Sequence, residues 1–196
     1  MRIYRMKADL AEKNVTFLGL LDHESFMKFD QELRRGLPVS DAFRFVELER
    51  DNSDLREKEF MDCSKLWITT GIVLFNQKAK DCLEGVFGDY VEFVPAKYQD
   101  DIYYIVNVLN VIDGLNYGKS EFEKLDDGRP YSINKFSLRP NIVNNISIFK
   151  LFLEESIYST EIFVSQEVKD IVEEIGRASV GKECVRRCRS RWSPYH

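Results

Sequence analysis

The sequence predicts an α+β fold in which about three helices lie on a mixed or mostly antiparallel sheet. Short apolar runs rich in β-branched and aromatic residues recur along the chain, and three amphipathic stretches of helical period lie between them. Gly, Pro and Asp stand at many of the junctions, which is typical of strands and helices joined by tight turns.

One motif occurs twice. Residues 75–88 read FNQKAKDCLEGVFG, and residues 164–176 read VSQEVKDIVEEIG. At an offset of 89 the shared residues are Gln77 and Gln166, Lys80 and Lys169, Asp81 and Asp170, and Glu84 and Glu173. Each copy follows a short β-rich run and begins at a capping residue, so the pattern indicates two related strand–helix units. A chance likeness between two ordinary strand–helix segments is the alternative.

The strands are predicted from composition and from the alternation of apolar and polar residues. In chain order, the expected strands cover residues 1–8, 14–21, 42–49, 64–75, 89–96, 102–112, 131–138, 146–152 and 161–164. Residues 64–75 are expected to hold one or two short strands, broken at Gly71. The first is expected at a sheet edge. Residues 102–112 are apolar enough for a central strand buried on both faces, and Pro95 is expected to end its strand.

The three expected helices have recognisable ends. The first covers residues 22–36, with Asp22 as its N-cap and Gly36 at its end. The other two are the helices of the repeated motif, which begin at Asn76 and Ser165. Residues 49–62 are the most polar stretch and are expected to form an exposed loop or a short helix.

Length and charge distinguish a folded body from a tail. Residues 1–176 are long enough to bury a core and are predicted to form a single α+β domain. They hold 22 basic and 32 acidic residues, a net charge of −10, whereas residues 177–196 hold six basic residues and one acid. Whether this basic tail is native or a foreign extension stays open, and we do not expect it to bind nucleic acid.

The compartment is predicted from what the sequence lacks. No apolar run approaches the roughly 18–20 residues that cross a bilayer, and the first residues contain no apolar segment typical of a signal peptide. We therefore expect a cytoplasmic protein without membrane association. In that compartment its four cysteines are expected to be reduced thiols. Cys184 and Cys188 do not have the usual spacing of zinc ligands.

No residue pattern predicts catalysis, a metal or a cofactor. His23 stands at a helix start, where Asp22 and Glu24 are more simply explained as capping and helix-dipole partners. Cys82 is expected on the apolar face of its helix as a small buried residue. The carboxylate pairs of Asp100 with Asp101 and Asp126 with Asp127 lie in turn-like segments, although a carboxylate-dependent hydrolase built from distant acids remains an alternative.

A binding surface is the remaining prediction. Residues 47–62 hold seven acids against three bases, and an acidic surface favours a basic protein partner. The simpler explanation of such a charge run is a solvated face. The candidate contacts are the acids Glu47, Glu49, Asp51, Asp54, Glu57 and Glu59, with Tyr117 and Tyr131 as aromatic anchors.

Residues 66–176 resemble bacterial polymorphic-toxin immunity proteins, specifically the group numbered eleven. The resemblance rests on NQKAKDCLE, DYVEFVP, IYYIVNVLNVIDGLNYGKS, IFKLF and EIFVSQEVKDIVEEIG, in that order. The matching positions are Pro95, Tyr103, Tyr104, Asn107, Asp113, Ser120, Phe149, Ser165 and Lys169. The chain departs from the family pattern after the last helix, where the basic tail replaces a Gly and a short apolar strand.

The resemblance implies a cytoplasmic protein that binds a cognate toxin stoichiometrically and neutralises it, without cofactor or catalytic residue. The identity of the toxin and the oligomeric state are not predicted. Two alternatives stay open beside this function. They are a small carboxylate-dependent hydrolase, which a cleft holding Asp100, Asp101, Asp113 or Asp126 would favour, and a ligand-sensing or scaffold module, which a buried apolar pocket would favour.

Overall fold

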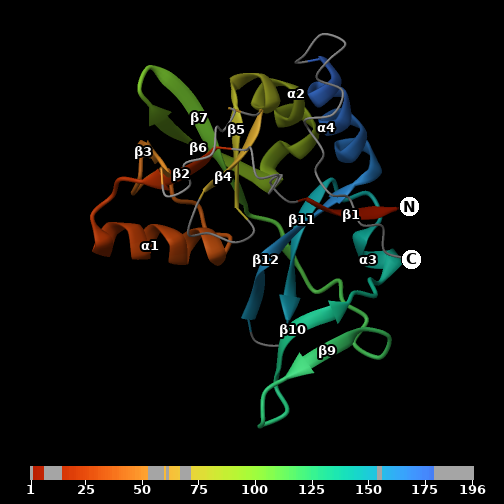
Figure 1. Cartoon of the computed structure of the whole chain (residues 1–196). Coiled ribbons are helices and arrows are strands. Elements are labelled where there is room, and N and C mark those ends of the chain that lie inside the picture. The colour runs from red at the N-terminus through yellow and green to blue at the C-terminus, as the bar shows by residue number, and fades with distance from the viewer. Residues whose placement is uncertain are drawn as a thin grey trace.

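A closed barrel and a separate four-stranded sheet form the protein in the computed structural model, which describes residues 2–6, 15–52, 60, 62–66, 72–153 and 156–178 (Figure 1). The barrel order is β2 (Thr16–Gly19), β3 (Val46–Arg50), β6 (Val91–Tyr98), β7 (Asp101–Val108), β5 (Val73–Asn76) and β4 (Cys63–Leu66). The pairs β2–β4 and β3–β6 are parallel and the others are antiparallel, so the predicted α+β fold with mixed strand pairing is confirmed.

The second sheet has the order β1 (Ile3–Met6), β12 (Ser156–Ser165), β11 (Ile148–Leu153) and β8 (Val111–Ile112). The N-terminal strand β1 lies at its edge, as expected. A two-stranded hairpin, β9 (Glu121–Lys124) with β10 (Pro130–Lys135), projects from this half of the molecule. The helices are α1 (His23–Arg34), α2 (Gln77–Phe87), the one-turn α3 (Pro140–Val143) and α4 (Gln166–Ala178), and a 3₁₀ turn η1 covers Gly88–Tyr90.

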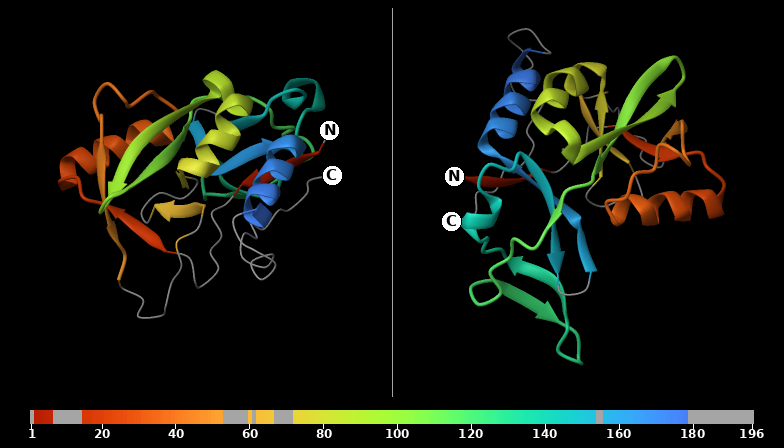
Figure 2. Two further views of the ribbon diagram at one scale, coloured as in Figure 1. Left: turned by 90° about the horizontal axis from the view of Figure 1, so that it is seen from above. Right: turned by 180° about the vertical axis from the view of Figure 1, so that it is seen from behind.

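Three apolar clusters hold these parts together. The barrel interior is filled by side chains such as Phe17, Leu74 and Ile105, and α1 packs Phe29 and Leu33 against them. A middle cluster joins the barrel wall, α2 and α4 to one face of the second sheet, and a third cluster joins the opposite sheet face to the β9–β10 hairpin and α3. The right-hand view of Figure 2 shows α2 and α4 side by side.

The helix ends are explained by the residues that the sequence places there. Asp22 Oδ1 accepts a 3.0 Å hydrogen bond from the backbone N–H of Ser25 and caps α1. Gly36, with φ +63°, turns the chain after α1, where a Cβ would lie 2.9 Å from Val111 Cγ2. Asn76 and Ser165 cap α2 and α4 by accepting hydrogen bonds from the backbone N–H three residues later.

Three local expectations are wrong. The strand expected over residues 102–112 is divided, because β7 ends at Val108 in the barrel and Val111–Ile112 form β8, which pairs with β11 in the second sheet. Strand β6 does not end at Pro95 but continues to Tyr98; β3 pairs with β6 only at Ala96 and Lys97, so Pro95 has no ladder partner on that side and its missing N–H is tolerated. Cys82 is exposed on α2, whose buried face is formed by Ala79, Leu83 and Phe87. The tail beyond Ala178 lies outside the described residues, and so do most residues of the expected 49–62 loop.

Candidate partner-binding surface

Strand β3 presents two of the predicted acids to solvent. Its burial alternates, with Val46 and Leu48 inside the barrel and Glu47 and Glu49 exposed outside. This follows from the two-residue period of a strand, in which successive side chains point to opposite faces. The apolar residues fix the register because a slip of one residue would bury both carboxylates.

Neighbouring strands extend this surface sideways. The backbone N–H of Leu20 donates a 2.8 Å hydrogen bond to the carbonyl of Glu47. In the pairing of β3 with β6, Glu47 lies opposite Lys97. Lys97 is in turn paired with Ile102 of β7. One exposed row therefore crosses from the end of β2 to β7, and with Phe45 and Glu49 it forms what we call the acidic–apolar row: Leu20, Phe45, Glu47, Glu49, Lys97 and Ile102.

The acidic–apolar row combines charge with exposed apolar area. Leu20 is 50% exposed, Phe45 44% and Ile102 38%. Asp100, in the turn between β6 and β7, and Asp101, the first residue of β7, are also exposed, so acids outnumber Lys97 along this side of the barrel. Large apolar side chains set among charges are typical of protein-binding surfaces, where the apolar residues supply desolvation energy and the charges supply orientation.

A half-buried carboxylate positions the segment that leads into β3. Glu92 of β6 accepts hydrogen bonds of 2.8 Å and 2.9 Å from the backbone N–H groups of Val39 and Ser40. The side-chain amide of Asn107 donates a further bond of 2.9 Å to Glu92 and one of 2.7 Å to the carbonyl of Leu37. Burial alone would raise the pKa of Glu92, but these donors stabilise the charged form and hold the pKa below its ordinary value.

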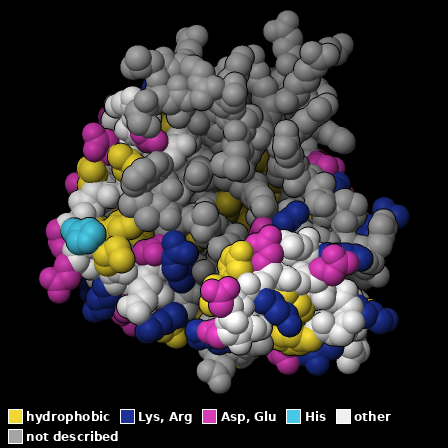
Figure 3. Space-filling view, turned by 60° about the horizontal axis from the view of Figure 1, so that its bottom comes forward, with side chains coloured by type: hydrophobic (Ala, Val, Ile, Leu, Met, Phe, Trp, Pro, Cys, Tyr) yellow, Lys and Arg dark blue, Asp and Glu magenta, His cyan; other side chains and the backbone are white. Residues whose placement is uncertain are grey.

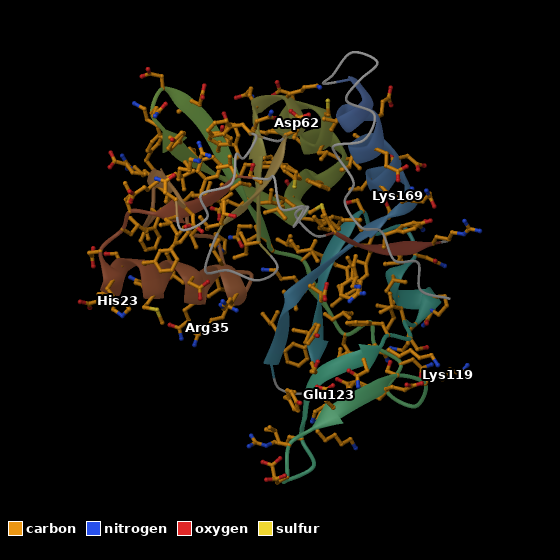
Figure 4. All side chains as sticks on the ribbon, in the orientation of Figure 1. His23, Arg35, Asp62, Lys119, Glu123 and Lys169 are labelled. Carbon is orange, nitrogen blue, oxygen red and sulfur yellow. The ribbon has the colours of Figure 1, made fainter. Side chains whose placement is uncertain are left out.

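The predicted aromatic anchors lie elsewhere. Tyr117 and Tyr131 are 41% and 54% exposed and belong to the hairpin region. Tyr117 stacks on Phe122 with ring centres 5.7 Å apart, and the hydroxyl of Tyr131 donates a 2.8 Å hydrogen bond to Glu123. Figure 4 labels Glu123 on this hairpin, apart from His23 at the start of α1 and Arg35 just after its end. The structure therefore does not bring the two tyrosines together with Glu47 and Glu49.

The other predicted acids add little to the described surface. Asp51 is only 9% exposed, and its N–H donates to the carbonyl of Thr16 at 2.8 Å, so we leave it out of the acidic–apolar row. Asp54, Glu57 and Glu59 lie outside the described residues.

The sequence interpretation missed Leu20, Phe45, Lys97 and Ile102. The alternation of FRFVELE carried a signal for Phe45, because it stands two residues before Glu47. Nothing local indicated Lys97 and Ile102, since their place depends on strand pairings across the barrel. In the space-filling view, hydrophobic, acidic and basic side chains are interspersed over the described part of the face shown, and hydrophobic side chains lie beside the histidine (Figure 3).

The residues considered for catalysis are dispersed. Asp100 and Asp101 lie where β6 turns into β7, and Asp126 lies in the hairpin turn. Asp113 follows β8, where its carboxylate pairs with Arg139 at 2.8 Å. Across the described parts of the chain, no group of three or more His, Cys, Asp and Glu side chains is placed to hold a metal ion. None of the helices within those parts combines the length and the apolar character needed to span a bilayer.

Comparison with known proteins assigns the chain to a family. No curated protein matches it. Residues 22–185 match the immunity protein family Imm11, which extends the resemblance seen in residues 66–176 to α1 and the whole barrel after β2. Because this match covers most of the 196 residues, the chain belongs to the Imm11 immunity protein family.

Proposed function

We propose that the protein binds a cognate bacterial toxin stoichiometrically in the cytoplasm and neutralises it by occupying the toxin's surface. Membership of an immunity protein family supports this function, and the observation that carries its structural side is the acidic–apolar row, which sets exposed Leu20, Phe45 and Ile102 beside Glu47 and Glu49. Such an inhibitor acts by binding alone and needs no catalytic residue or cofactor.

The expected partner is basic at its contact site. The residues of the body, 1–176, have a net charge of −10, so long-range attraction would speed encounter with a positively charged toxin. The apolar side chains would then provide the desolvated centre that a stable complex requires. Tyr117 and Tyr131 on the hairpin form a second, separate surface that we propose as an additional contact of the same partner.

Affinity capture tests this function. The full chain is used to capture proteins from a lysate of its native bacterium under conditions in which the toxin is expressed, and the intact mass of the purified complex is measured. We expect one toxin bound at a fixed molar ratio, with a basic surface. Absence of a stoichiometric partner while the toxin is demonstrably present would remove the proposal.

A further inference from the structure

The repeated motif occupies the same structural position twice. Phe75 of β5 and Val164 of β12 are 89 residues apart in the sequence, like the motif residues that follow them. Phe75 is paired antiparallel with Cys63 of β4 on one side and with Tyr104 of β7 on the other. Val164 is paired antiparallel with Ile148 of β11 and with Tyr4 of β1. Each copy is therefore the middle strand of three, followed by its helix.

In the first copy, the helix holds the tyrosine of the neighbouring strand. The hydroxyl of Tyr104 donates a 2.6 Å hydrogen bond to Gln77 Oε1, and Gln77 Nε2 donates to Asp81 at 2.6 Å. The ammonium of Lys80 lies 5.3 Å from the centre of the Tyr104 ring and 2.8 Å from Glu84. Lys80 thus combines a cation–π contact with an ion pair.

The second copy makes the same contacts with the equivalent residues. The hydroxyl of Tyr4 donates to Gln166 Oε1, and Gln166 Nε2 donates to Asp170 at 2.7 Å. The ammonium of Lys169 lies 5.4 Å from the centre of the Tyr4 ring and 2.8 Å from Glu173. The agreement extends from sequence to pairing register and then to individual side-chain contacts, which a chance likeness of two helices does not explain.

The strand that carries the tyrosine is connected differently in the two copies. Tyr104 lies on β7, which follows α2 after the short turn and β6, whereas Tyr4 lies on β1 at the start of the chain. The same contacts therefore form with opposite chain order. The second copy is completed only when the N-terminal strand returns to the helix at the other end of the domain.

We propose that the protein consists of two copies of one unit, each made of three strands and a helix, and that the Gln and Lys of each helix clamp the tyrosine of the adjacent strand. The first unit is β4, β5, α2 and β7, and the second is β11, β12, α4 and β1. In the second unit these contacts hold the N-terminal strand β1 at the edge of the sheet. Within the described sheet β1 has a backbone partner on one side only, so the side-chain contacts add to its attachment.

Two double-mutant cycles test the clamp. The first combines Tyr104→Phe with Gln77→Ala and the second combines Tyr4→Phe with Gln166→Ala, and each variant is unfolded in denaturant as the full chain. We expect each Tyr→Phe change to raise the unfolding equilibrium constant about fivefold, the usual effect of one lost hydrogen bond. The double variant should be little worse than the Gln→Ala variant, because both changes remove the same bond.

The control is Tyr90→Phe, an exposed tyrosine of η1 outside both clamps, which should leave the constant unchanged. Additive effects in either cycle, or coupling in one cycle and none in the other, would overturn the proposal. A cap exchange in the second copy adds an independent comparison: Ser165→Asn introduces the cap of the first copy and should be tolerated, whereas Ser165→Ala should raise the constant about fivefold. An equal loss of stability in Ser165→Asn and Ser165→Ala would contradict the equivalence of the two units.

Discussion

The ammonium of Lys150, on β11, donates a 2.7 Å hydrogen bond to the carbonyl of Leu33 near the end of α1, and this lysine is completely buried. The bond joins the second sheet to the helix that packs on the barrel. Burial, with the positive charge of Arg34 as a smaller cause, lowers the pKa of Lys150 to about 8, and Asp30 opposes the shift. A cation normally found at the surface therefore lies at the junction of the two halves.

This burial predicts an unusual pH dependence of stability. Between pH 8 and the ordinary lysine value of 10.5, the unfolded chain binds a proton that the folded protein does not, so Lys150 makes stability rise with pH. The buried charge costs up to roughly 3 kcal/mol at neutral pH. In Lys150→Met, whose side chain has a similar volume, this rise should disappear. Denaturant unfolding at pH 7, 8.5 and 9.5 measures it, and parallel pH profiles for the two proteins would contradict the account.

Glu92 also makes stability rise with pH, but in the acid range. Its pKa is lowered in the folded protein, so its stabilisation is complete above the ordinary value of 4.5 and is lost as pH falls through the folded value. Glu92→Gln should cost about 2 kcal/mol at pH 7, because a neutral amide accepts hydrogen bonds less strongly and turns its NH₂ group towards other donors. Urea unfolding at pH 7 and pH 4 should show the difference shrinking at pH 4.

The matched control for that change is Glu121→Gln, at an exposed carboxylate that pairs with Lys135 at 3.0 Å on the hairpin. An exposed pair of this kind contributes about 0–1 kcal/mol. An equal loss of stability in both variants would show that the contacts of Glu92 with Val39 and Ser40 add nothing beyond surface charge.

Gly36 predicts a steric effect. In Gly36→Ala the new Cβ would meet Val111 Cγ2 at 2.9 Å and the carbonyl of Val108 at 3.1 Å, in addition to the strain of a positive φ. Gly128 also has a positive φ, but a Cβ added there would meet no atom within 4 Å, so Gly128→Ala carries the backbone strain alone. We expect losses of about 1 kcal/mol for Gly128→Ala and at least about 2 kcal/mol for Gly36→Ala. Thermal unfolding measures both, and equal losses would exclude the clash.

The acidic–apolar row predicts charge-dependent association. The double variant Glu47→Lys with Glu49→Lys reverses two charges of this row. It should slow binding of the toxin about tenfold at low salt and reduce the dependence of the association rate on ionic strength. Glu167→Lys with Glu174→Lys makes the same change in net charge on exposed positions of α4 and should have a smaller effect. Stopped-flow or biosensor kinetics distinguish the two. Equal slowing by both pairs would assign the effect to net charge and not to the acidic–apolar row.

The local elements of this fold were predictable, and their assembly was not. The caps Asp22 and Asn76 and the alternation around Glu47 each depend on a few neighbouring residues, and the structure has them where the sequence placed them. The closed barrel depends on the parallel pairs β2–β4 and β3–β6, which join segments distant in the sequence and leave no local pattern.

The candidate site and part of the core also depend on contacts between segments distant in the sequence. Lys97 and Ile102 join the acidic–apolar row only through pairing across β6 and β7. Lys150 stands in an apolar strand whose consecutive residues are buried on both faces. Nothing local in the sequence indicates that a lysine is accepted there because a helix carbonyl lies opposite it. The repeated motif is the exception, since its matched residues in the sequence proved to make matched contacts.

Titration of the purified toxin with the full chain tests the central claim most directly. Toxin activity is measured against the molar ratio of the two proteins after complete mixing. The account predicts that activity falls linearly and vanishes at a fixed stoichiometric ratio, and that the ratio does not change with time. Progressive loss of activity at substoichiometric amounts would indicate an enzyme acting on the toxin, and unchanged activity at a molar excess would contradict neutralisation by binding.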